Sequence, residues 1–188
     1  MDESTEGVTL HSAFILKVVE PFRDMERLCA PLFELVRPLD TALPRDPAPI
    51  ALYNEVCAWI EKNLGAASVR AAGHAIGKNA FERMNREGTI NEHTIPSEAL
   101  GALARAVLVT IQDPKKRGWQ IRENTDGHVV IRRTQTFNCV MQEGVLLAIV
   151  TATSVTLPRV EHVRCTRRGD EYCEYDVRWM PQRLSRAM

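Results

Sequence analysis

The sequence lacks an excess of charge of either sign. Lys plus Arg and Asp plus Glu each number 24 among the 188 residues, so the formal net charge is +0 at pH 7. Proteins that hold a phosphate backbone or an anionic membrane surface use a positive field to do so. We therefore expect neither nucleic acid nor a membrane as a partner.

Long apolar runs are also missing. The longest apolar stretch that matters, Val145–Val150 with its flanks, is far shorter than the ~20 residues of a transmembrane helix. The acidic start, MDESTEG, is not followed by the apolar run and small-residue cleavage site of a signal peptide. These absences predict a cytoplasmic protein.

A disulfide framework and the common catalytic motifs are absent too. Five cysteines is an odd number, and cysteines stay reduced in the cytoplasm. Cys29 and Cys57 fall on apolar helical faces, which predicts core positions for both. No glycine-rich phosphate loop, nucleophile elbow or two-histidine helix motif occurs. We therefore do not expect an enzyme.

Apolar spacing divides the chain into helices followed by strands. Residues 1–46 are predicted as an N-terminal helical segment and linker, 47–180 as the main domain, and 181–188 as a tail, because prolines gather between 38 and 49. Helical periodicity then covers 50–64, 66–87 and 96–112, and an apolar block at 139–154 is predicted to be a buried helix.

Two hairpins complete the predicted fold. Turn chemistry at 124–127 follows Trp119, and Arg168-Gly169-Asp170 separates the β-type runs 160–166 and 171–179. The order predicts an α+β fold, in which a helical N-terminal half precedes an antiparallel sheet of two hairpins that flank a buried helix.

Gly73 and Gly77 lie four residues apart on one predicted helix. This spacing indicates either tight packing against another helix or a groove that a ligand can enter. His74 between them is expected at the surface.

The strongest chemical pattern is a pair of cysteines in the second hairpin. Cys165 and Cys173 each lie four residues from Gly169, so a symmetric hairpin places them opposite each other. Cross-strand thiolates supply half of a tetrahedral zinc site. Two small buried hydrophobes or a redox pair are the alternatives.

Cys139 and His162 are the candidates for the other two ligands. Cys139 begins the predicted buried helix, where the helix dipole favours a thiolate. The odd offset of His162 from Cys165 puts it on the opposite strand face, whereas Glu161 shares the face of Cys165. A bulge would return His162 to the site, and Glu161 is the alternate. The expected metal ligands are therefore Cys139, His162, Cys165 and Cys173, around structural Zn2+.

The segments EHVRC (161–165) and RGDEYCEY (168–175) resemble the signature that closes the 4-vinyl-reductase domain. The resemblance extends over residues 50–180 and is strongest at the C-terminal end. Phenol-sensing bacterial activators of that family hold zinc through three cysteines and a glutamate, and His162 stands at the glutamate position. The implied α+β fold is shared with vesicle-tethering TRAPP subunits and related to haem nitric-oxide sensors.

The resemblance also implies a function. It indicates a ligand-binding sensor for a small apolar or aromatic molecule, acting as a homodimer and signalling through a protein partner. Trp119 and His93 are its loosely aligned pocket residues. The alternative is a dimeric TRAPP-like scaffold without a ligand, and a tetrapyrrole-related role is a third, weaker alternative. An enclosed apolar cavity near Trp119 would favour sensing, and a filled core would favour the scaffold.

Overall fold

The protein is described from a computed structural model that covers residues 4–43, 45–133 and 137–180. Within these ranges the chain forms six α-helices and two antiparallel sheets. The α+β class is thus confirmed, with a mainly helical N-terminal half that precedes the larger sheet. The predicted tail, 181–188, lies outside the described residues.

The N-terminal part is built from short helices. The elements are β1 (Thr9–His11), α1 (Ser12–Val19), the 3-10 helix η1 (Glu20–Met25), α2 (Ala30–Val36), β2 (Pro47–Pro49) and α3 (Ile50–Leu64). Pro21 and Pro31 each lie in the first turn of a new helix, where a missing N–H costs nothing. The prolines therefore divide the predicted helical segment into short helices.

Two longer helices follow α3. They are α4 (Ala66–Arg86) and α5 (Pro96–Thr110). Gly65, with φ 86°, separates α3 from α4 in a conformation that other residues rarely adopt. Ile111, predicted as helical, instead begins the short strand β3 (Ile111–Gln112).

A small sheet of order β2-β1-β3 joins the start of the chain to the residues after α5. Sequence reasoning missed it because its strands have only two or three residues and show no alternating pattern. The larger sheet has the order β4-β5-β7-β6, with β4 (Trp119–Thr125), β5 (His128–Arg133), β6 (Thr156–Arg164) and β7 (Cys173–Met180). The helix α6 (Cys139–Ala152) connects its two hairpins, and η2 (Thr166–Arg168) lies between β6 and β7.

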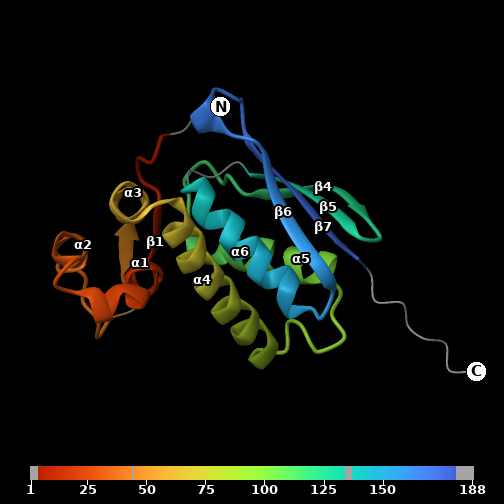
Figure 1. Ribbon diagram of the computed structural model, residues 1–188, viewed down its shortest axis with the longest axis horizontal. Helices are drawn as coiled ribbons and strands as arrows, with labels where there is room; N and C mark the ends of the chain where they lie inside the picture. The colour runs from red at the N-terminus through yellow and green to blue at the C-terminus, as the bar shows by residue number, and fades with distance from the viewer. Residues whose placement is uncertain (1–3, 44, 134–136, 181–188) are drawn as a thin grey trace, which may run out of the picture.

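The elements form two hydrophobic cores. One core joins α1, α2 and α3 to the beginning of α4, and the other joins α5 and α6 to the large sheet. Figure 1 shows α1, α2 and α3 at one end of the molecule, the large sheet at the other, and α4 beside α6 between them. The first core contains residues on both sides of position 46, so the predicted domain division stays a prediction.

Glycines allow α4 and α6 to pack closely. A Cβ atom on Gly73 would overlap the carbonyl oxygen of Met141, and one on Gly77 would lie 2.5 Å from that of Val145. Both spaces are filled by α6 backbone, so the tight-packing interpretation is confirmed and the open groove is not formed. His74 is exposed, as expected.

Candidate functional site

A cavity lies where the N-terminal helices meet the α5, α6 and sheet half of the molecule. Its wall takes residues from β1, α1, α3, α4, α5, β3, β4 and α6, and its volume is about 70 Å³. The apolar part of the wall consists of Leu10, Phe14, Ile76, Ala80, Met84, Leu103, Ala106, Val107, Ile111, Phe137 and Val145. Because both cores contribute, a ligand here would contact both halves of the fold.

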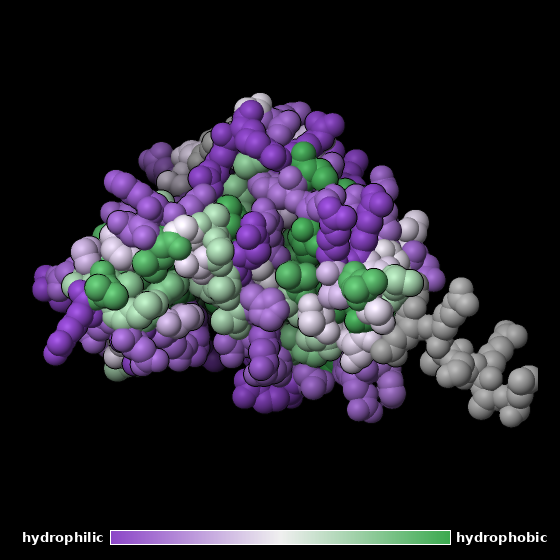
Figure 2. All heavy atoms as spheres, in the orientation of Figure 1, coloured by the Kyte–Doolittle hydropathy of each residue, from purple (hydrophilic) through white to green (hydrophobic). Residues whose placement is uncertain are grey.

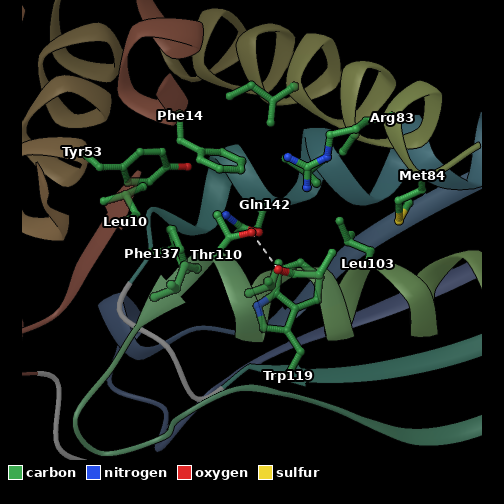
Figure 3. A pocket seen from close by; sticks show the side chains of 16 residues that line it. Leu10, Phe14, Tyr53, Arg83, Met84, Leu103, Thr110, Trp119, Phe137 and Gln142 are labelled. Carbon is green, nitrogen blue, oxygen red and sulfur yellow. Dashed lines mark hydrogen bonds between the residues drawn. The ribbon is translucent and has the colours of Figure 1, made fainter. Parts of the chain in front are cut away.

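A few polar side chains enter this apolar wall. Figure 3 shows Arg83 from α4 and Gln142 from α6 pointing into the pocket, with Trp119 on another side. Thr110 also lines the cavity, but its hydroxyl donates to the carbonyl oxygen of Ala106 at 2.7 Å. The groups to which a ligand could hydrogen-bond are therefore Arg83, Gln142, Trp119 and the hydroxyl of Tyr53.

Gln142 is the most unusual of these side chains. It is 5% exposed, and no hydrogen bond joins its amide to any residue that the structure describes. Its amide is not among the fully buried unpaired atoms of the described residues, which in this wall are Arg83 Nε and Trp119 Nε1, so it can meet water or a ligand in the cavity. This amide therefore marks the cavity as a place for a polar group or water.

Trp119 lies in the pocket wall, whereas His93 does not. Trp119 is 9% exposed, and its indole Nε1 is buried without a hydrogen-bond partner among the described residues. The His93 side chain is 87% exposed in the loop before α5, beside Glu92. His93 therefore lies outside this cavity, because the loop turns it to the surface.

A second, more open pocket adjoins the first. Its volume is about 310 Å³, and the two share Phe14, Ile76, Ala80 and Arg83. Its other lining residues are Ala13, Lys17, Asn79 and Arg86. Among the described residues, three cations and no acidic side chain thus line the approach to the apolar cavity. Sequence reasoning missed Arg83 and Gln142 because each looks like an ordinary polar residue on a helix.

The four predicted metal ligands meet at the N-terminal end of α6. The ligand atoms of Cys139, His162, Cys165 and Cys173 all lie within 4.8 Å of one another. Cys139 begins α6, and the Asn138 side chain caps that helix by accepting from the Met141 amide at 3.0 Å. The cluster joins the helix to the β6–β7 hairpin, and it is the group of described residues that could hold a metal ion.

A bulge in β6 brings His162 to the cluster. His162 pairs with Tyr175 in the ladder, and the register shifts before the next pair, Arg164 with Glu174. The extra residue turns His162 toward Cys165 despite the odd spacing. Glu161, the alternate, instead pairs with Arg159 on the exposed side of the strand. Geometry therefore selects His162 over Glu161 as a member of the cluster.

Charge around the cluster favours one thiolate. A hydrogen bond from Cys139, together with His162 and Arg133, outweighs burial and lowers the pKa of the Cys173 thiol. The same contact and burial raise the pKa of Cys139. Burial alone would lower the pKa of His162, but nearby Cys173 and Glu143 raise it. These surroundings thus favour the thiolate form of Cys173 and the protonated form of His162.

All five cysteines are free and buried. Cys29 and Cys57 belong to the N-terminal core, as predicted. In the cluster, Sγ of Cys139 and Sγ of Cys165 are 3.6 Å apart, which is a contact and not a covalent bond. Since Cys165 and Cys173 are both free, the disulfide alternative for this pair is not formed.

Comparisons with known proteins identify solved structures with a similar fold. No protein-family profile matches the chain, and a search of curated proteins also finds no match. The similar solved structures are H-NOX domains, a haem-nitric oxide/oxygen-binding class. One is an H-NOX protein from S. oneidensis in the Fe(II)NO ligation state, with TM-score 0.66 and 12% identity, covering 90% of this chain and 99% of that one.

A second structure of this kind is an S. oneidensis H-NOX triple mutant in the Fe(II) state, with TM-score 0.65 and 14% identity, covering 92% of this chain and 97% of that one. At this identity the likeness shows the fold alone. It nevertheless corrects two predictions. The assignment to 4-vinyl-reductase and TRAPP-type proteins is wrong, because the structural neighbours are H-NOX domains. Structural zinc is likewise the wrong cofactor for this fold, whose neighbours are described with Fe(II).

The cavity of this chain does not fit a haem. None of its five histidines or five cysteines is among the described residues that line the cavity, although histidine and cysteine are the usual axial ligands of haem iron. Tyr53 lines it, and burial raises the pKa of its phenol well above its ordinary value. The volume of about 70 Å³ is also far below the ~300–1,000 Å³ of sites for drug-sized ligands.

None of the helices in the described ranges has both the length and the apolar character that crossing a membrane requires.

Proposed function

We propose that this chain is a small-molecule-binding sensory module and that its ligand occupies the cavity between the two cores. The observation that carries the proposal is Trp119, whose indole Nε1 is buried in an otherwise apolar wall and has no hydrogen-bond partner among the described residues. A folded protein keeps such a group when a bound molecule pairs with it, since an apolar residue would otherwise be more stable.

The place of the cavity supports a sensory role. Its wall joins Leu10 and Phe14 of the N-terminal part to Leu103 and Val145 of the other core. A ligand that binds one packing of these parts better than another shifts the population between them. Small-ligand complexes of proteins with this fold, described as Fe(II)NO and Fe(II)CO states, agree with such a use.

Other parts of the function are proposals of the same kind. The output passes through a partner protein, the chain forms a homodimer, and it has no catalytic activity. Figure 2 shows apolar residues exposed among hydrophilic ones over the N-terminal helices and over α4 and α6. The TRAPP-like scaffold alternative is not favoured, because its family resemblance is overturned and the core beside Trp119 contains an unfilled cavity.

The test is a ligand screen by two-dimensional NMR on the full chain, followed on the indole N–H of Trp119. A binder should move this signal and leave those of Trp59 and Trp179 less affected. Ala80→Phe, which fills the cavity from α4, should abolish the response. Ala71→Phe, at an exposed position of the same helix, is the matched control and should respond like the wild type. Ligands that bind Ala80→Phe as well as the wild type would place the site elsewhere.

A further inference from the structure

The polar groups of the two adjoining pockets determine what kind of molecule they can accept. A guanidinium and an indole N–H are donors only, whereas a glutamine amide can donate or accept. Arg83, Trp119 and Gln142 therefore offer a surplus of donors to the cavity. A complementary ligand must carry acceptors at that point.

The charge of the pockets selects an anion. Arg83 belongs to both pockets, so it stands at the junction between the apolar cavity and the open approach. Its ion pair with Glu87 is long, 3.7 Å from Nε to Oε1, and Glu87 is 59% exposed. An exposed pair of this kind contributes little, so Arg83 remains available to an incoming anion. Arg86 adds positive charge along the approach, whereas Lys17 is already paired with Glu20 at 2.6 Å.

Size and polarity limit the anion further. The inner wall is almost wholly apolar, with Leu103, Val107 and Val145 among its residues. Of the three cations, Arg83 alone reaches this inner wall. A dianionic phosphate would be left partly unpaired there, which is costly in an apolar site. A monoanion with an apolar body matches both parts of the pocket.

We infer that the pocket binds a small monocarboxylate, with its carboxylate between the Arg83 guanidinium and the Gln142 amide and its hydrocarbon part in the apolar cavity. This inference rests on the proposed function, since it names the ligand class of the same site. The Arg83 fork and a carboxylate have matching bidentate geometry, and the Gln142 amide donates to the same group. Trp119 contacts the body of the ligand.

Isothermal titration of the full chain with hexanoate and benzoate, beside the neutral hexanamide and benzamide, tests the inference. The acids should bind the wild type at least about tenfold more tightly than the amides. Arg83→Gln should weaken binding of the acids about 10- to 100-fold, the loss expected for a charge-assisted hydrogen bond, and Arg83→Lys should restore part of it. Gln142→Leu should also weaken the acids.

Lys78→Gln is the matched control, because Lys78 is exposed on the same helix and lines neither pocket. It should bind the acids as the wild type does. Equal affinity for acids and amides would overturn the carboxylate assignment while leaving the proposed function intact. Binding of no compound, acid or amide, together with a negative NMR screen, would overturn both.

Discussion

Gly144 of α6 lies directly against the backbone of Arg70 in α4. A Cβ atom at Gly144 would overlap the Arg70 carbonyl oxygen and lie 2.8 Å from the amide nitrogen of His74. This contact fixes the separation of the two helices and thereby the width of the cavity between Arg83 and Gln142.

The first prediction concerns this contact. Gly144→Ala should lower the free energy of unfolding by about 2–3 kcal/mol, because backbone atoms cannot yield as a flexible side chain can. Gly101→Ala is the control, since its Cβ would meet nothing nearer than 3.6 Å. Alanine there should stabilise α5 by up to ~1 kcal/mol through helix propensity. Urea denaturation measures both, and equal effects of the two variants would contradict the packing argument.

Gln142→Leu should separate stability from binding. Leucine removes an unpaired amide from an apolar wall, so the unliganded variant should be as stable as the wild type or up to ~1 kcal/mol more stable. Ligand binding should be lost at the same time. Gln120→Leu, at an exposed position of β4, is the control and shows how the same replacement changes stability at the surface. A loss of more than about 1 kcal/mol in thermal unfolding without ligand would mean that the Gln142 amide has a stabilising partner.

Tyr175 connects β7 to the start of α6. Its buried hydroxyl donates to the carbonyl oxygen of Cys139 at 3.1 Å, and its ring stacks on His162 with centroids 4.6 Å apart. Tyr175→Phe keeps the ring and removes one hydrogen bond, so it should cost about 1 kcal/mol. Tyr172→Phe, whose ring lies against Arg132 near the surface, should cost almost nothing. Chemical denaturation measures both variants. An unchanged free energy of unfolding for Tyr175→Phe would show that its hydrogen bond adds no net stability.

The Asp113–Arg117 pair should make stability depend on acid pH. The two side chains are 4% and 10% exposed, with Nε of Arg117 2.7 Å from Oδ2 of Asp113. Burial alone would raise the pKa of Asp113, but hydrogen bonds from Arg117 and the Lys115 amide outweigh it and lower that pKa. Asp113→Asn should therefore lose about 2 kcal/mol at neutral pH.

The sign of this dependence follows from the lowered pKa. The folded form binds the Asp113 proton less readily than the unfolded chain, whose aspartate pKa is about 3.9. The stabilisation is thus complete above about pH 5 and declines as the pH falls toward and through the folded-state pKa. The difference between wild type and Asp113→Asn, measured across pH 3–7, should be constant in the upper part and shrink at the acid end. A difference that grows on acidification would mean that the folded form binds the Asp113 proton more readily than the unfolded chain.

Haemin should not form a defined complex with this chain. No histidine or cysteine is among the described residues that line the cavity, and its volume is about 70 Å³. Titration of the purified protein with haemin should show the spectrum of free haemin, without a Soret shift that saturates at one equivalent. A saturating shift that Ala80→Phe removes would show that the cavity opens to admit the group.

Local patterns allowed much of the fold to be predicted. The bounds of α3 follow from apolar spacing and Gly65, and the first hairpin follows from turn residues at Gly127. The small sheet was missed because tertiary pairing alone defines its short strands. Cys139, His162, Cys165 and Cys173 could be grouped by spacing, because two of them share one hairpin. The metal-ligand role of these four residues stays a prediction.

The pocket was harder to foresee. Arg83 and Gln142 are far apart in the sequence, and neither stands in a motif. Only the packing of α4 on α6 shows that both side chains enter one cavity. Trp119 could be suggested by a family resemblance, although that resemblance named the wrong family. Helix packing, more than local sequence, therefore determines which residues of such a domain face the ligand.

The bulge in β6 has a consequence for sequence comparison. Strict alternation would place His162 on the opposite strand face from Cys165, because the offset between them is odd, and the extra residue Val163 removes this mismatch. Deletion of Val163 would leave an even offset in a regular strand, so both side chains would still share one face. In an alignment of distant relatives, a one-residue gap at this position is therefore compatible with the same cluster.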